Sequence, residues 1–213
     1  MENVTDRVSN PFGISPPCDR FVPGYGDANA DFHVVGDHPG SYGGADSGIP
    51  FTNEAGRRLQ NALAAADLLK SVGERPVAGS SFLSYLHMCV PDDGDERGEP
   101  TTADYDAMER FFDAEVRAIA AHVLLPVGER ATRHVIETYT ARSGKIDLDM
   151  DALHASEVLG TGWLVYPIAD PGEWTDEDEQ RLVEALARLQ ATDFRREVDL
   201  GRFLGGDEPY FVR

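Results

Sequence analysis

The stretch FHVVGDHPGSYGGADSGIPFTNEAGRRL, residues 32–59, decides the fold. An apolar run over 32–35 ends in a glycine, a polar glycine-rich loop follows, and a helical pattern starts at Thr52 or Asn53. This order predicts a strand, a long loop and a helix. In α/β folds the carboxyl ends of the strands carry the functional side chains. The reactive or stacking groups on this loop are Asp37, His38, Tyr42 and Phe51.

The same alternation of strand and helix continues along the chain. Further strands are expected over 81–88, 122–127 and 163–168, each separated from the next by a helical pattern. This alternation predicts a single-domain, three-layer α/β/α fold with a central, mainly parallel four-stranded sheet. We expect three parts: an extended N-terminal arm over 1–30, the domain over 31–191, and a C-terminal tail over 192–213 packed on the domain.

The charge of the chain is strongly negative. The 213 residues include 38 acidic and 19 basic side chains, a formal net charge of −19, and the only lysines are Lys70 and Lys145. Acid-rich, lysine-poor proteins are typical of very high salt, where the Debye length falls to about 3 Å and self-repulsion is screened. We therefore favour a halophilic, haloarchaeal protein over an ordinary acidic one. The acidity argues against a nonspecific nucleic-acid binder in dilute salt, an argument that weakens in concentrated salt.

No apolar run approaches the length of a membrane span, and the N-terminus lacks the apolar core of a signal peptide. We therefore expect a cytoplasmic protein with no membrane partner. Its two cysteines, Cys18 and Cys89, do not make a disulfide framework. Both can be small buried residues, and a reducible disulfide between them is the alternative that a reducing cytoplasm disfavours.

Six short motifs keep a characteristic order. They are GDHPG from Gly36, GIPF from Gly48, EAG from Glu54, CVPDDGDERGEPTTADYDAMERFF from Cys89, HVLLPVGERATRHVI from His122 and YPIADPGEW from Tyr166. This ordered set resembles the uracil-DNA glycosylase superfamily, and within it the branch that carries an iron–sulfur cluster. The resemblance covers roughly residues 15–190. It implies that the chain hydrolyses the N-glycosidic bond of uracil or a related deaminated base that has been flipped out of DNA.

The resemblance implies roles for the first loop. Phe51 corresponds to the aromatic ring that stacks on the base, a contact of about 1–3 kcal/mol; the alternative is a core anchor at a helix start. Backbone groups of Gly36, Pro39 and Gly40 would hold base oxygens and the charge of the leaving group. Asp37 would position the attacking water, with His38 as its helper or as a base contact. Alternatively, Asp37 caps the loop and His38 is a solvated loop residue.

Two positions depart from the family pattern. Asp170 stands where the family has a histidine that stabilises the anionic leaving base, and a carboxylate would repel that anion unless it were protonated. Tyr85 stands near the family's base-reading asparagine, where it would fill the pocket or read a different base. The loop that follows Asp170 contacts DNA in the family, and it includes Pro171, Gly172 and Trp174. Trp174 is either a wedge in the minor groove or a core residue.

The iron–sulfur cluster of the resembling branch is not expected here. Cys18 and Cys89 match two of its four cysteine ligands, whereas Ser15 and Met108 stand at the other two positions. We therefore predict no cofactor and no metal. The resemblance also implies that the two cysteines lie close in space, since their counterparts bind one cluster.

Three functions stay open from the sequence. The first is a monomeric DNA glycosylase acting on single- or double-stranded DNA. The second is a catalytically impaired protein of the same fold that binds DNA or a nucleobase without cleavage, which Tyr85 and Asp170 favour. The third is a nucleotide- or nucleobase-binding α/β protein, although the chain lacks both a P-loop lysine and a G-x-G-x-x-G turn.

Overall fold

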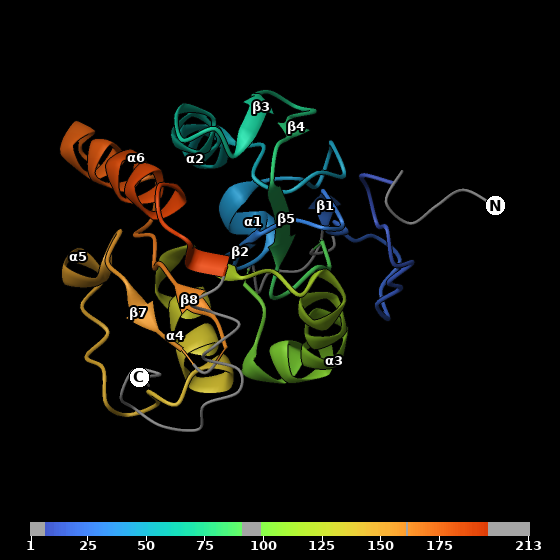
Figure 1. The fold of residues 1–213 in the computed structure, drawn as a ribbon. Helices are drawn as coiled ribbons and strands as arrows, with labels where there is room; N and C mark the ends of the chain where they lie inside the picture. Colours follow the sequence, from blue (N-terminus) through green and yellow to red (C-terminus); the bar gives the residue numbers. More distant parts are fainter. Residues whose placement is uncertain (1–6, 91–98, 161, 196–213) are drawn as a thin grey trace.

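The computed structural model describes residues 7–90, 99–160 and 162–195. Within these ranges a six-stranded sheet forms the centre of the protein, and a separate two-stranded hairpin lies beside it (Figure 1). The strands of the main sheet are β1 Tyr25–Gly26, β2 Phe32–Gly36, β5 Ser81–Tyr85, β6 Val123–Pro126, β7 Val158–Leu159 and β8 Leu164–Val165. The hairpin strands are β3 Leu69–Ser71 and β4 Val77–Ala78.

The strand order across the main sheet is β1-β5-β2-β6-β8-β7. The four inner strands are mutually parallel, and they are the four that the sequence predicts. The expected mainly parallel α/β architecture is therefore confirmed. The predicted total of four strands was too low, because β1 and β7 add antiparallel edges. Each of these edge strands has only two residues, too short to give a periodic pattern in the sequence.

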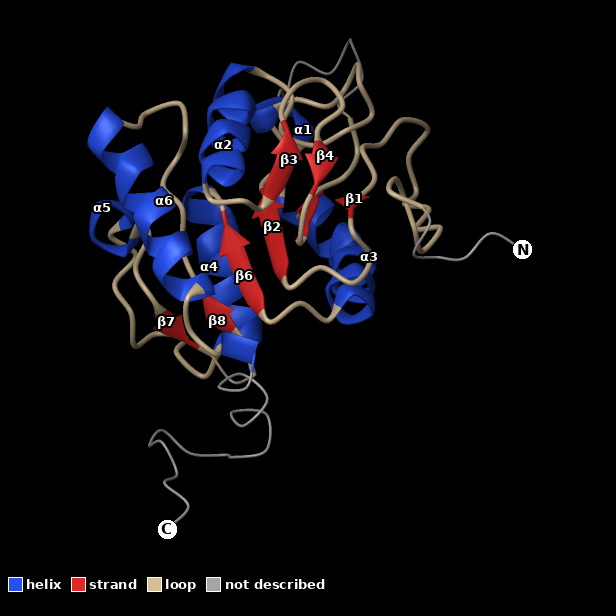
Figure 2. Ribbon diagram, turned by 45° about the horizontal axis from the view of Figure 1, so that its top comes forward, coloured by secondary structure: helices blue, strands red, loops and turns tan. Residues whose placement is uncertain are grey.

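Helices cover both faces of the sheet. They are α1 Pro39–Tyr42, α2 Glu54–Ala65, α3 Thr102–Ile119, α4 Gly128–Tyr139, α5 Met150–Leu153 and α6 Asp176–Gln190. Helices α2 and α6 contribute to one apolar cluster, and α3 and α4 contribute to another. Figure 2 shows α2 and α6 side by side. The starts of α3 and α6 were predictable, because Thr101 and Thr175 each form a capping box with an aspartate three residues later.

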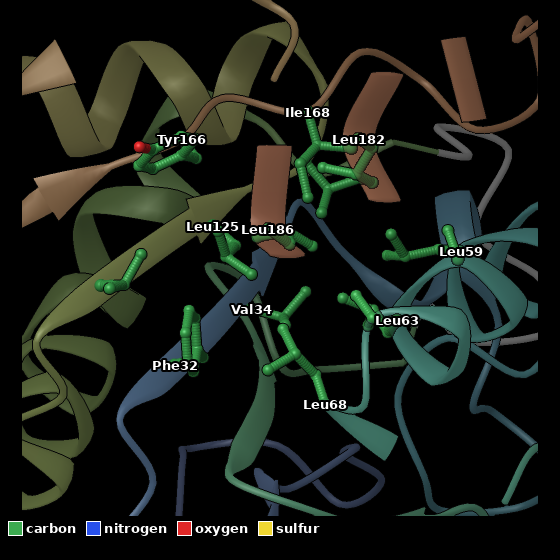
Figure 3. Close-up of a cluster of buried hydrophobic side chains, with 14 of the residues drawn as sticks. Phe32, Val34, Leu59, Leu63, Leu68, Leu125, Tyr166, Ile168, Leu182 and Leu186 are labelled. Carbon is green, nitrogen blue, oxygen red and sulfur yellow. The ribbon is translucent and has the colours of Figure 1, made fainter. Parts of the chain in front are cut away.

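The core follows from the alternation of side chains along the buried strands. Strands β2, β5 and β6 are buried along their full lengths, as expected for parallel strands covered on both faces. Phe32 and Val34 of β2 point to the face of α2 and α6, whereas Val35 points to the face of α3 and α4. Figure 3 shows the first of these clusters, with labelled side chains Phe32, Val34, Leu59, Leu63, Leu68, Leu125, Tyr166, Ile168, Leu182 and Leu186.

The chain reverses its winding direction next to β2. It leaves β2 to form β5 on one side, and then returns past β2 to form β6 on the other side. The loops that follow β2 and β6 therefore diverge at the carboxyl edge of the sheet. Such a switch point is where open α/β sheets bind ligands. The topology thus places any site at the ends of these two strands.

A disulfide between Cys18 and Cys89 fastens the N-terminal segment to the end of β5. The proximity implied by the resemblance is confirmed, and of the two alternatives the structure has the less favoured one, a disulfide. The backbone on both sides of the bond is paired as well, since the Val22 N–H donates to the Met88 carbonyl and the Val90 N–H to the Arg20 carbonyl. These contacts hold the two sulfur atoms at bonding distance.

Of the proposed C-terminal tail, only residues 192–195 lie within the described structure. Phe194 is buried and packs on Phe32, with 5.3 Å between ring centroids. Residues 196–213 lie outside the described residues. Among the helices that are described, none is both long and apolar enough to cross a membrane.

Buried polar groups link β2, β5 and α3. The Nε2 atom of His33 lies 2.7 Å from the Ser84 hydroxyl, and Ser84 also faces the carboxyl group of Glu115. Burial raises the pKa of Glu115 to about 8, an effect that Ser84 and the backbone of Gly24 partly offset. Burial also lowers the pKa of His33 to about 3. Both groups are therefore neutral in the folded protein at neutral pH.

Glu115 sets the expected dependence of stability on pH above about pH 6.5. Folded Glu115 keeps its proton up to about pH 8, whereas the unfolded chain loses it near pH 4.5, so the free energy of unfolding falls as the pH rises between these values. His33 contributes the opposite slope between about pH 3 and 6.5. Burial also lowers the pKa of His38, His87, His134 and His154, so these histidines act in the same direction as His33. Below about pH 6.5 they oppose the Glu115 slope, and the loss of stability that Glu115 causes appears above it.

The Glu115→Gln variant is expected to remove this loss while keeping the shape of the side chain. One titrating proton changes the free energy of unfolding by about 1.4 kcal/mol per pH unit, or roughly 2 kcal/mol between pH 6.5 and 8. Urea unfolding at several pH values measures the slope. Glu109→Gln, at an exposed position of the same helix, is the control and should retain the wild-type slope. Equal slopes for the wild type and Glu115→Gln would contradict the assignment.

Candidate functional site

A cavity of about 600 Å³ opens at the switch point of the sheet. Its walls come from the loops after β2, β6 and β8 and from the segments around α5 and the start of α6. The lining residues are Asp37, Ser41, Tyr42, Val127, Gly128, Glu129, Arg130, Arg133, Met150, Asp151, His154, Ala169, Asp170, Glu173, Trp174, Asp178 and Arg181. The volume suits one nucleoside-sized ligand.

Asp37 lies at the carboxyl end of β2, and one of its carboxylate oxygens accepts a hydrogen bond while the other forms an ion pair. The Tyr105 hydroxyl donates to Oδ1, and the Nε atom of Arg130 lies 3.4 Å from Oδ2. The Arg130 guanidinium also stacks 4.6 Å from the centre of the Tyr105 ring. Burial, and then the hydrogen bond to Asp37, raise the pKa of Tyr105, so its hydroxyl stays a proton donor. The carboxylate is thus held in one orientation at the cavity wall.

His38 shapes the loop and does not line the cavity. Its Nδ1 accepts a hydrogen bond from the Gly40 N–H at 3.1 Å, which caps the short helix α1. The proton therefore sits on Nε2, which lies 3.0 Å from the Ser41 hydroxyl. Burial lowers the pKa of His38, so the imidazole is neutral at pH 7. Pro39 is the first residue of α1, where its missing N–H leaves no bond unmade.

Asp170 also lines the cavity, from the end of the strand segment that continues β8. It is exposed, and its Oδ1 accepts a hydrogen bond from the Gly172 N–H at 2.9 Å. The preceding loop is fixed by His154, whose Nδ1 accepts from the Ala169 N–H at 2.9 Å. Nε2 of the same ring therefore donates to the Asp178 carbonyl.

Trp174 is part of the cavity wall and does not protrude from the surface. Only 6% of the residue is exposed, and its indole N–H donates to the Ala169 carbonyl at 2.9 Å. The guanidinium of Arg58 lies 5.8 Å from the ring centre and donates to the Trp174 carbonyl. Pro171 is buried next to it, whereas Gly172 is exposed on the rim. Of the three residues predicted to contact DNA, Gly172 is the exposed one.

Phe51 adopts a strained backbone conformation, with φ at +61°. A bulky residue in the left-handed region costs free energy and persists only where its surroundings impose it. Here the Tyr85 hydroxyl accepts from the Phe51 N–H at 2.7 Å, and the buried Gln60 amide donates to the Phe51 carbonyl at 2.7 Å. Gly56 also packs against this backbone, because a methyl group on it would lie 2.4 Å from the Phe51 carbonyl carbon.

The rings of Tyr42, Phe51 and Tyr85 form one buried cluster. Tyr42 stacks on Phe51 with centroids 5.5 Å apart and an interplanar angle of 27°. Tyr85 packs on Phe51 at 5.1 Å, and its hydroxyl donates to the Gly43 carbonyl at 2.8 Å. Gly36 must lack a side chain, because a methyl group there would lie 2.7 Å from the Phe51 ring and from the Tyr85 ring.

Some of the predicted site residues thus line the cavity, and others do not. Asp37 and Asp170 face it from two walls, and both carboxylates, after burial, raise the pKa of Tyr42. Phe51 and Tyr85 lie behind Tyr42, with at most 1% of either residue exposed. Sequence reasoning missed Tyr105 and Arg130 as partners of Asp37. Tyr105 fits the apolar face of its helix, and Arg130 follows a strand as an ordinary helical residue, so neither gives a local signal.

The donor set does not fit an iron–sulfur cluster. Both cysteines of the chain are joined in the disulfide, so neither is a free thiolate ligand. Over the described ranges, no group of three or more histidine, cysteine, aspartate or glutamate side chains could hold a metal ion. The arrangement at the cavity therefore provides carboxylate chemistry, with Asp37 held by one hydrogen bond and one ion pair.

Comparison with known proteins identifies one family. Residues 23–189 match the model of the family described as the uracil DNA glycosylase superfamily. The matched segment includes every residue of the cavity wall. No curated protein matches the chain.

Proposed function

The chain belongs to the uracil DNA glycosylase superfamily, and from this premise we propose that it hydrolyses the N-glycosidic bond of a deaminated base, uracil or a related base, in DNA. The observation that carries the proposal is the position of Asp37. It lies at the carboxyl end of β2, on the wall of the cavity at the switch point, with its carboxylate oriented by Tyr105 and Arg130.

The proposed chemistry follows from the charges at the two walls. When the bond to the base breaks, the sugar acquires oxocarbenium character and the base becomes anionic. The Asp37 carboxylate would stabilise the sugar cation and orient the attacking water. Backbone groups at Gly36, Pro39 and Gly40 would contact the base. The Asp170 carboxylate offers no donor to the departing base unless it is protonated.

A direct assay tests this function. Oligonucleotides that contain uracil, hypoxanthine or xanthine are incubated with the protein in molar salt, and the released base is quantified. Release from at least one of them is expected. If none is released while DNA still binds, the second function applies: a protein of the same fold that binds DNA or a nucleobase without cleavage. The buried Phe51 and the carboxylate of Asp170 favour this alternative.

The Asp170→His variant separates these two functions. A histidine at this position could donate to the departing base, the interaction whose removal costs other enzymes about 10²- to 10³-fold in rate. Because the loop is not preorganised for that donor, we expect a smaller gain, about tenfold, in uracil release at pH 6–7. Asp176→His, an exposed position on the next helix, is the control. An unchanged rate in Asp170→His would show that leaving-group stabilisation is not the missing element.

We also propose that the protein works in concentrated salt, as a monomer. The support is the net charge of −19 with only two lysines, and the acidic first turn of α6 beside the cavity. DNA approaching such a surface meets less repulsion when the Debye length is about 3 Å. Full stability in dilute buffer would contradict this proposal. The cytoplasmic location stays a prediction, and the disulfide is more typical of oxidising compartments.

A further inference from the structure

The ring of Phe51, on which a base is expected to stack, is already covered by another side chain of the protein. Tyr42 stacks on Phe51 nearly in parallel, and only 3% of Tyr42 and 1% of Phe51 are exposed. Tyr85 contacts Phe51 as well. Tyr42 is the one member of these three rings that also lines the cavity. It therefore lies between the cavity and Phe51.

The backbone around Tyr42 holds its ring in this place. The Asn53 N–H donates to the Tyr42 carbonyl at 3.3 Å, and the Asn53 side-chain amide donates to the Ser41 carbonyl at 2.8 Å. On the other side, Tyr85 donates to the Gly43 carbonyl. At the far end of the ring, a methyl group on Gly128 would lie 2.7 Å from the Tyr42 hydroxyl. The ring is thus fixed at its backbone and enclosed at its tip.

We propose that Tyr42 blocks the base-stacking position of this site. Its ring takes the place on Phe51 that a pyrimidine base would occupy, so a base stacks on Phe51 only after Tyr42 has been displaced. A phenol and a pyrimidine are both single six-membered rings. Removal of the phenol therefore opens a space for one pyrimidine, next to Asp37 and Asp170. This inference rests on the proposed function, because it assumes that Phe51 is the base platform.

The Tyr42→Ala variant tests the proposal with free uracil as the probe. Equilibrium dialysis in molar salt measures the affinity of the wild type and the variant for uracil. We expect the variant to bind uracil at least tenfold more tightly than the wild type. Tyr42→Phe is the matched control, because it retains the ring and should bind no better than the wild type. Circular dichroism verifies folding, and Tyr42→Val replaces Tyr42→Ala if the alanine variant does not fold.

A second measurement separates this inference from the proposed function. Uracil release from a uracil-containing oligonucleotide is assayed with the same proteins. If Tyr42→Ala gains uracil binding but no protein releases the base, the inference holds and the proposed function fails. If the wild type releases uracil and Tyr42→Ala binds uracil no more tightly, the function holds and the inference fails. Equal gains in Tyr42→Phe and Tyr42→Ala would also overturn the inference, since the ring would then not be the obstacle.

Discussion

Replacing Asp37 with alanine is expected to lower the rate of base release by about 10²- to 10⁴-fold, the usual contribution of a positioned acid or base. The expectation follows from the site. Asp37 is the carboxylate on the cavity wall whose two oxygens are held by Tyr105 and Arg130, so its orientation is set before a substrate arrives. Preorganised charge of this kind stabilises a transition state without reorganisation.

Single-turnover release of uracil in molar salt measures this effect. Asp46→Ala is the matched control, because Asp46 is an exposed carboxylate of the same loop that does not line the cavity. Tyr105→Phe should give an intermediate loss, since it removes one of the two contacts that orient Asp37. If Asp37→Ala released base at the wild-type rate, Asp37 would have no part in the chemistry.

Loss of the Cys18–Cys89 disulfide is expected to reduce the free energy of unfolding by about 4 kcal/mol. The bond closes a loop with a sequence separation of 71 residues. In the chain-entropy model a loop of this length restricts the unfolded chain by about that amount. For a domain of this size the change corresponds to a fall of roughly 10 °C in Tm. The closed loop contains β2, α2 and β5, so the disulfide constrains the part of the chain that forms one side of the site.

Thermal unfolding with and without a reductant measures the contribution of the disulfide. The Cys18→Ser/Cys89→Ser double variant should unfold at the Tm of the reduced wild type, and the reductant should leave the variant unchanged. The double variant is thus the control for any other effect of the reductant. A wild-type Tm that does not respond to complete reduction would refute the expected contribution.

Part of the site could be predicted from local sequence, and part could not. The loop after β2 was recognisable because an apolar run, glycines and an N-capping asparagine are close together in the chain. The roles of the individual residues in this loop could not be predicted in the same way. His38 was a candidate helper in catalysis, yet its ring caps α1, a contact that depends on the exact turn of the loop. The Tyr42 contact with Phe51 joins two loop positions that only the folded loop brings face to face.

By itself, the sequence determined the order of the elements, the parallel centre of the sheet, the family and the surplus of negative charge. The family is implied by the ordered motifs, and the other properties depend on apolar periodicity, capping residues and composition, which are local or summed along the chain. Only the tertiary structure decided that Tyr105 and Arg130 orient Asp37, that Cys18 and Cys89 are bonded, and that Tyr42 covers Phe51. Each of these contacts depends on how the loops and helices around the parallel strands pack in three dimensions, and that packing leaves no periodic trace in the sequence.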